Sequence, residues 1–141
     1  MDKNVTMPLW KSFLLFSLAL VLLVTTAPIG FVYAVFRQTI IKQANSLAVY
    51  FLELALALDN LGNALMQHVL NDVLLVKTDK TYYFGNKLET ISSVIGKNSI
   101  TGTLSYWGQR LNAFLHWIDA NHSLNSINYD IKRWKQSRAI P

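Results

Sequence analysis

A continuous apolar run from Phe13 to Phe36 carries no charged side chain, and it constrains the fold of this chain more than any other feature. An α-helix rises about 1.5 Å per residue, so a helix over this run is roughly 36 Å long. The hydrocarbon core of a bilayer is about 30 Å thick, and such a helix crosses it with some tilt. The run therefore predicts a transmembrane helix over residues 13–36, preceded by a short flank over residues 1–12.

A cleaved signal peptide is the alternative interpretation of this segment, with Lys3 and Lys11 as its charged region. Two features oppose cleavage. Pro28 directly follows the small residue Ala27, and the apolar run continues through the next candidate site at Ala34. The sequence therefore favours an uncleaved anchor.

Charge and cysteine content limit the chemistry that the chain can support. It has 141 residues with a net charge of +5, and it contains no cysteine. Disulfides, iron–sulfur clusters and thiolate zinc sites are therefore excluded. The histidines lack the spacing of metal ligands, so we expect no metal and no cofactor. The excess of basic residues after the apolar run favours a cytoplasmic C-terminus under the positive-inside rule.

Polar residues recur at helical spacing within residues 37–76, which predicts one long amphipathic helix. They form a single polar stripe, which consists of Glu53, Asn60, Asn63, Gln67 and Asn71. In one interpretation the helix lies against the bilayer or packs on the C-terminal part, with the polar stripe outward. In the other, Leu47 to Met66 is a second span whose stripe lines an oligomeric pore. Burying Glu53 and Asp59 in hydrocarbon costs about 2.5–3.5 kcal/mol each, which favours the helix that does not span.

Glycines recur within residues 77–103, which predicts a loop-rich segment. Within it, Asn86 and Glu89 have the spacing of a capping box, which predicts a short helix over residues 87–95 that ends at Gly96. The polar residues at this junction are Asn86, Glu89, Ser92 and Ser93. They could form a cluster that faces a substrate, but helix capping is the favoured interpretation.

Residues 104–141 predict a helical C-terminal part with a basic tail. Aromatic residues on two faces of its first helix predict that one side is buried and the other lies at the membrane interface. The tail mixes apolar and basic residues, which fits a membrane-surface helix and equally fits a solvated C-terminal helix with a few packing residues. Lipid is favoured over nucleic acid as its partner. The predicted membrane contacts are Tyr106, Trp107, Trp117, Trp134, Lys132 and Arg133.

Asp119 and His122 lie three residues apart, and such a pair can orient a general base. A nucleophile at attack distance is missing from the pattern, since Ser123 is only adjacent in sequence. The favoured interpretation is therefore a helix cap and a histidine that holds a turn in place. An enzyme that uses Glu89, Asp119 and His122 remains the alternative.

Three motifs follow one another along the chain: DNLGNAL from Asp59, GNKLETISS from Gly85 and DANHS from Asp119. They resemble the "DQLxN", "GNPDETISS" and "DxxHC" motifs of a family of small uncharacterised bacteriophage and prophage proteins, some of which have an N-terminal membrane anchor. Ser123 stands where that family has cysteine. The resemblance implies a phage or prophage origin, and it implies no known activity.

These observations together predict a mostly α fold, in which an N-terminal transmembrane helix precedes a small helical domain with a long amphipathic helix and a loop-rich middle. We expect a single-pass protein of a bacterial inner membrane that acts by binding, without catalysis. The expected partners are the lipid bilayer, a second copy of the chain, or a phage or host membrane protein. The alternative function is a holin-like pore with two spans.

Overall fold

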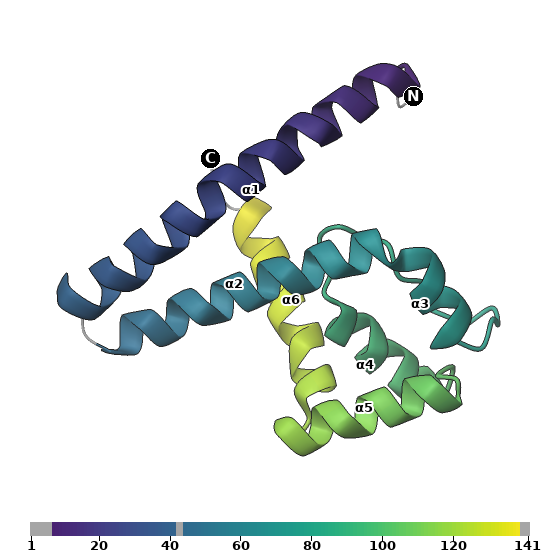
Figure 1. The fold of residues 1–141 in the computed structure, drawn as a ribbon. Helices are drawn as coiled ribbons and strands as arrows, with labels where there is room; N and C mark the ends of the chain where they lie inside the picture. The colour runs from purple at the N-terminus through teal and green to yellow at the C-terminus, as the bar shows by residue number, and fades with distance from the viewer. Residues whose placement is uncertain (1–6, 42–43, 139–141) are drawn as a thin grey trace. The chain divides into compact units, whose positions relative to one another are not determined.

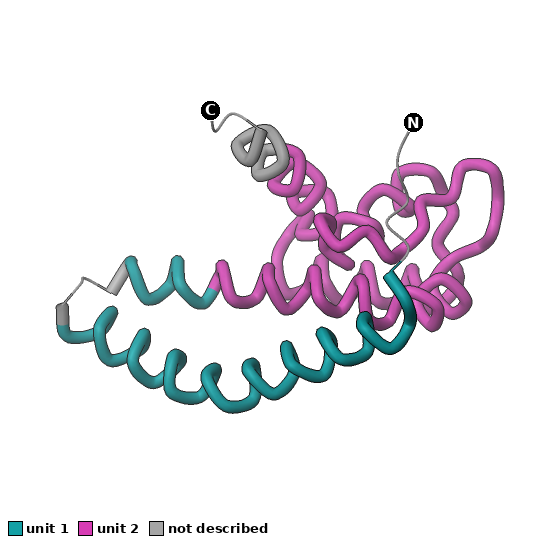
Figure 2. The backbone as a smooth tube through the Cα atoms, turned by 90° about the horizontal axis from the view of Figure 1, so that it is seen from above, with its two compact units in different colours: residues 1–51 teal, residues 52–141 magenta. Residues whose placement is uncertain are grey.

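The computed structural model describes residues 7–41 and 44–138. It describes only the backbone of residues 41, 44, 45 and 132–138. The described part is mostly helical and has a long apolar helix near its N-terminus, as predicted. Its helices are α1 (Leu9–Ile41), α2 (Ala44–Leu65), α3 (Gln67–Val73), α4 (Ile91–Thr101), α5 (Tyr106–Ile118) and α6 (His122–Arg138) (Figure 1). The chain forms two compact units, residues 1–51 and residues 52–141 (Figure 2).

Helix α1 is longer than the predicted span at both ends. Among the described residues it is the one helix that is long and apolar enough to cross a membrane. Its two central threonines bond within the helix: Thr25 Oγ1 donates to the Val21 carbonyl at 2.8 Å, and Thr26 Oγ1 donates to the Leu22 carbonyl at 2.7 Å. A spanning helix must satisfy its polar groups in this way, because the hydrocarbon core contains no water.

The predicted single helix over residues 37–76 is wrong in its bounds. Residues 37–41 belong to α1, and the remainder is divided between α2 and α3 at Met66. Helix α3 ends at Val73 because the next residues enter the core and pair with a distant segment. Leu75 forms an isolated antiparallel bridge with Leu104.

The predicted helix over residues 87–95 is also wrong, since α4 begins later and continues through Gly96. Its N-cap is Thr90, whose Oγ1 accepts from the Ser93 N–H at 3.1 Å. It ends at Gly102, whose φ of 69° is a left-handed conformation that glycine adopts without steric cost. Gly96 has a packing role instead, because a Cβ atom there would collide with the carbonyl oxygen of Ser123 in α6.

The core of the second unit lies around α4, which packs against α5 and α6. Its buried apolar residues come from several segments, namely Leu74, Leu75, Phe84, Val94, Ile95 and Leu104. Helix α5 begins after Ser105, whose Oγ accepts from the Gly108 N–H at 3.2 Å. Gly108 lies against the backbone carbonyl of Leu74, which allows α5 to approach this segment closely. The segment that connects α3 to α4 also enters this core through Phe84.

Candidate functional site

Asn63 and Asn71 of the polar stripe face the interior of the second unit, which corrects both interpretations for these two residues. Asn63 is 0% exposed. Its Oδ1 accepts from the Gly85 N–H at 2.8 Å, and its Nδ2 donates to the Glu89 carbonyl at 2.6 Å. Asn71 pairs in the same way with Phe84, accepting from its N–H at 2.8 Å and donating to its carbonyl at 3.2 Å. These amides therefore neither face water nor line a pore.

A third asparagine, Asn98 of α4, completes this arrangement. It is 0% exposed, its Oδ1 accepts from the Tyr82 N–H at 3.0 Å, and its Nδ2 donates to the Tyr82 carbonyl at 2.7 Å. We refer to Asn63, Asn71 and Asn98 as the asparagine clamp. Because a side-chain amide carries both a donor and an acceptor, each of the three can pair with the backbone as a neighbouring strand would. The clamp thereby holds residues 82–89 against three helices.

The other members of the polar stripe lie closer to the surface. Glu53 is exposed, and its Oε1 accepts from the Tyr129 hydroxyl at 3.2 Å. Asn60 is half-buried, and its Oδ1 is buried without a hydrogen-bond partner. Gln67 is half-buried beside Gly85, where its side chain occupies the space that a Cβ atom would need. Apart from the exposed Glu53, the stripe therefore serves packing within the unit.

Two carboxylates bind the first turn of α4. Asp59 of α2 accepts from the Ile91 N–H at 3.0 Å and from the Ser92 hydroxyl at 3.1 Å. Asp130 of α6 accepts from the Thr90 N–H at 3.0 Å and from the Thr90 hydroxyl at 2.9 Å. Negative charge is favourable at a helix N-terminus, and here the chain supplies it from its own side chains. No local sequence pattern predicts this role, because both aspartates come from other helices.

The predicted polar cluster is brought together, but its groups bind one another. Ser93 Oγ donates to Glu89 Oε1 at 2.8 Å, and the Glu89 carboxylate also pairs with Lys97 Nζ at 2.5 Å. Asn86 does not cap a helix. Its Oδ1 accepts from the Leu88 N–H at 3.1 Å within a local turn, because α4 begins only at Ile91. The cluster is thus a structural junction between the loop and α4.

Asp119 and His122 lie together at the turn between α5 and α6, where Asp119 Oδ2 is 3.2 Å from His122 Nδ1. In the same turn, His116 Nδ1 accepts from the N–H of Asn121, which has a φ of 62°. His122 lines a hollow of about 140 Å³, whereas Glu89 lines a different hollow of about 260 Å³. The three residues of the enzymatic alternative are therefore not gathered around one cavity.

Within the described residues, no group of three or more His, Cys, Asp and Glu side chains could hold a metal ion. Asp72 and Lys77 form an exposed ion pair at 2.7 Å. The hydrogen bond and charge of Lys77 lower the pKa of Asp72, and Asp72 raises the pKa of Lys77 in return.

Helix α5 presents an exposed aromatic face. The exposed fractions of its side chains range from 52% at Phe114 to 81% at Trp117. The face consists of Tyr106, Trp107, Phe114, Trp117 and Ile118. The guanidinium of Arg110 lies 5.2 Å from the centre of the Tyr106 ring. The opposite side of α5 carries Leu111 and Leu115, which pack on the core. Of the predicted membrane contacts, the side chains of Trp134, Lys132 and Arg133 lie outside the described residues.

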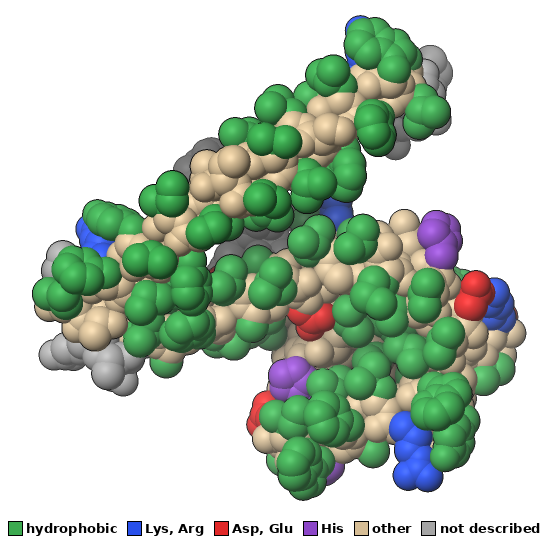
Figure 3. Space-filling model, viewed as in Figure 1, with side chains coloured by type: hydrophobic (Ala, Val, Ile, Leu, Met, Phe, Trp, Pro, Cys, Tyr) green, Lys and Arg blue, Asp and Glu red, His purple; other side chains and the backbone are tan. Residues whose placement is uncertain are grey.

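The second exposed apolar surface belongs to α2 and α3, on the side away from the asparagine clamp. We call it the outer face, and its members are Leu58, Leu61, Leu65, Met66 and Val69, each at least 46% exposed. Figure 3 shows hydrophobic side chains over α2, α3 and α5 on one side of the second unit. This side therefore exposes apolar groups from several helices at once.

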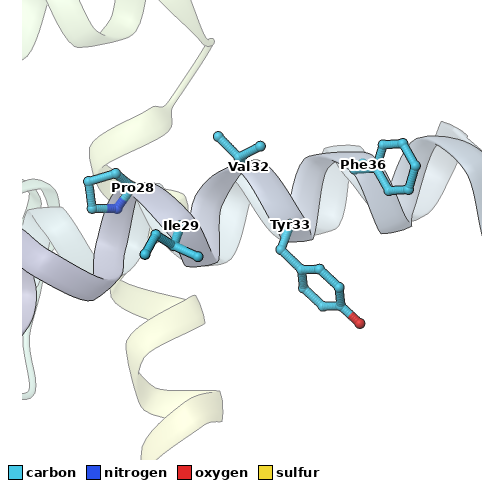
Figure 4. Close-up of a pocket in the computed structure, with 5 residues that line it drawn as sticks. All are labelled: Pro28, Ile29, Val32, Tyr33 and Phe36. Atoms are coloured by element: carbon cyan, nitrogen blue, oxygen red, sulfur yellow. The ribbon is translucent and has the colours of Figure 1, made fainter.

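A hollow of about 590 Å³ lies along α1 beside Pro28. Its lining residues all belong to this one helix, and they are Pro28, Ile29, Val32, Tyr33 and Phe36 (Figure 4). The Tyr33 hydroxyl is the one polar side-chain group among them. The lining is therefore almost entirely apolar.

Comparisons with family models, with curated proteins and with solved structures found no match to this chain.

Proposed function

We propose that the protein is a single-pass membrane protein of phage or prophage origin that acts by binding at the host membrane, without catalysis. In this proposal α1 crosses the bacterial inner membrane, and the helical unit that follows stays at the cytoplasmic surface of the bilayer. The resemblance of its three motifs to phage and prophage proteins supports the origin. The excess of basic residues after the span supports the orientation.

The aromatic face of α5 is the observation that carries the proposal. A soluble helix turns its large apolar residues inward, yet α5 buries Gly108 and exposes Trp107 and Trp117 by 63% and 81%. Tryptophan and tyrosine favour the headgroup level of a bilayer, because their rings combine an apolar body with a polar group. Arg110 beside Tyr106 adds a positive charge that suits anionic lipid.

Two observations weigh against the alternatives. A two-span pore would need α2 as its second span, but α1 is the one helix among the described residues that is long and apolar enough to cross a membrane, and the stripe amide Asn63 of α2 is bonded within the unit. An enzyme would need Glu89 and His122 around one substrate, but they line separate hollows.

The proposal can be tested with one labelled variant, because the chain contains no cysteine. Trp117→Cys would carry an environment-sensitive fluorophore in full-length protein reconstituted into vesicles of phosphatidylethanolamine and phosphatidylglycerol. We expect a blue-shifted emission relative to Lys80→Cys, a control on an exposed loop. Identical emission from the two positions would contradict membrane contact by α5.

A further inference from the structure

We propose that the guanidinium of Arg110 binds the phosphate of an anionic phospholipid, so that the docking of α5 depends on the anionic lipid content of the leaflet. This inference rests on the proposed function, because it requires the aromatic face of α5 to contact the membrane. It adds to that function a binding site for one class of lipid headgroup. It also makes the contact of α5 responsive to lipid composition.

Arg110 lies in the middle of the aromatic face. Residues three or four apart share one face of a helix, and Tyr106, Trp107 and Phe114 have this spacing from Arg110. Before it, the rings of Tyr106 and Trp107 lie with their centres 5.4 Å apart. After it, the rings of Phe114 and Trp117 are stacked with their centres 6.1 Å apart. The cation is therefore flanked by aromatic pairs in both directions along the helix.

The Tyr106 side chain holds one part of the guanidinium and leaves the rest available. Nε of Arg110 donates to the Tyr106 hydroxyl at 3.2 Å, and the guanidinium lies 5.2 Å from the centre of the same ring. Arginine has five N–H donors, and the four on the terminal nitrogens have no partner among the described residues. Parallel N–H groups on a guanidinium match two oxygens of a phosphate. Arg110 is exposed, so a headgroup can reach them.

The charge of Arg110 is not balanced by a nearby carboxylate of the chain. The sequence has no Asp or Glu between Glu89 and Asp119. Of these two, Glu89 pairs with Lys97, and Asp119 lies beside His122. Among the side chains that the structure describes, no carboxylate forms an ion pair with Arg110. An exposed cation without a partner in its own chain attracts an anion from its surroundings.

Lipid fits this site better than an acidic segment of another protein. Aromatic and arginine side chains that dominate binding to a protein cluster in well-packed pockets. The aromatic face lies outside the hollows of about 490, 260 and 140 Å³ in the second unit, which are lined by other residues. A contact with lipid headgroups requires no pocket. Rings at the headgroup level and a basic residue beside an anionic leaflet are both favourable.

The experiment measures docking of α5 in full-length protein reconstituted into nanodiscs of phosphatidylcholine, alone or with increasing phosphatidylglycerol. Every protein carries an environment-sensitive fluorophore at Trp117→Cys. Arg110→Gln removes the charge, and Arg110→Lys keeps the charge but lacks the paired N–H groups of a guanidinium. Lys80→Gln is the matched control, because it removes the same charge from an exposed loop of the same unit.

We expect phosphatidylglycerol to increase the blue shift of the label in the parent protein. At one lipid composition, the ratio of docked to undocked label should be about fivefold lower in Arg110→Gln, which is the effect of one basic residue near an anionic surface. Lys80→Gln should match the parent protein, and Arg110→Lys should lie between the parent and Arg110→Gln.

The possible failures are distinguishable. An equal blue shift with and without phosphatidylglycerol, or equal docking of Arg110→Gln and Lys80→Gln, would overturn the phosphate site and leave the proposed function standing. Docking of Arg110→Lys equal to that of the parent protein would replace the phosphate site with a general attraction of charge. A label that stays aqueous at every lipid composition would contradict membrane contact by α5, and both proposals would fail.

Discussion

The side chain of Asn98 binds both backbone polar groups of Tyr82, accepting from its N–H at 3.0 Å and donating to its carbonyl at 2.7 Å. Asn98 also donates to the Val94 carbonyl at 2.8 Å and accepts from the Thr103 hydroxyl at 2.5 Å. One buried amide thus joins α4 to the connection before it and to the segment after it. Buried polar networks of this kind stabilise a fold only when every group is paired.

Removal of this amide should destabilise the protein strongly. Asn98→Ala leaves the N–H and the carbonyl of Tyr82 without their partner, and an unpaired buried polar group costs about 1–3 kcal/mol. We expect a loss of about 3 kcal/mol in the free energy of unfolding, measured by urea denaturation in detergent with circular dichroism. Asn125→Ala is the matched control on exposed α6 surface, where the side chain makes a single long contact of 3.5 Å. Equal stability of the two variants would show that the clamp contributes nothing.

The carboxylate at the start of α4 should also be stabilising. Asp59→Ala removes two hydrogen bonds and a negative charge from the helix N-terminus, and loss of a capping residue typically costs about 0.5–2 kcal/mol. Thermal unfolding in detergent would report this as a lower midpoint. A midpoint unchanged from the parent protein would mean that water replaces the carboxylate at no cost.

Asp72→Asn provides the comparison for Asp59, because its ion pair with Lys77 is exposed. The pKa of Asp72 is lowered by Lys77, so any stability from this pair is present above the ordinary aspartate pKa of 3.8 and is lost as the pH falls. The pKa of Lys77 is raised, so the same contribution is lost again as the pH rises past 10.5. Exposed pairs contribute little and are screened by salt. We therefore expect the unfolding midpoint of Asp72→Asn at neutral pH to match that of the parent protein.

Gly96→Ala should destabilise the protein although alanine is the better helix former. The new Cβ atom would collide with the carbonyl oxygen of Ser123, and overpacking typically costs about 1–3 kcal/mol against a gain of about 1 kcal/mol in helix propensity. Gly30→Ala is the control, since a Cβ atom there meets nothing within 4 Å. Urea denaturation should give a lower midpoint for the first variant alone. Stabilisation by both variants would mean that α4 and α6 can separate without cost.

Ser123→Ala should be neutral or stabilising. The hydroxyl of Ser123 is buried and has no hydrogen-bond partner, so its removal relieves a desolvation cost of up to about 1–3 kcal/mol. Ser93→Ala is the matched comparison, because that equally buried hydroxyl donates to Glu89 at 2.8 Å. The two variants should shift the thermal midpoint in opposite directions or by clearly different amounts. A large loss of stability in Ser123→Ala would reveal a partner for this hydroxyl.

Sequence periodicity predicted the helices well where the signal is local. The uncharged run predicted α1, and the aromatic residues around Trp107 and Trp117 predicted the helix that is α5. The same reasoning identified the polar stripe but oriented it wrongly. Spacing shows which residues share a face of a helix, but it does not show what covers that face. Asn63 is covered by the backbone of Gly85 and Glu89, which lie more than 20 residues further along the chain.

The start and end of α4 could not be read from local spacing for a related reason. Asn86 and Glu89 have the spacing of a capping box, but the Asn86 side chain bonds to the Leu88 N–H within a turn. The first turn of α4 is bound instead by Asp59 and Asp130, which are distant in sequence. Gly96 looked like a helix end because glycine usually terminates helices. Glycine is needed at position 96 because α6 approaches the backbone of α4 there. A sequence window around residue 96 contains no residue of α6.

The asparagine clamp also has a consequence for biosynthesis. A ribosome completes α2 well before it has made Tyr82, Phe84 and Gly85, the backbone partners of the clamp. Asn63 precedes its partner Gly85 by 22 residues and Asn71 precedes its partner Phe84 by 13, so neither amide has its backbone partner until the connecting segment has been synthesised. Pairing with that segment then buries the amide of Asn63 and leaves the leucine side of α2 as its exposed surface.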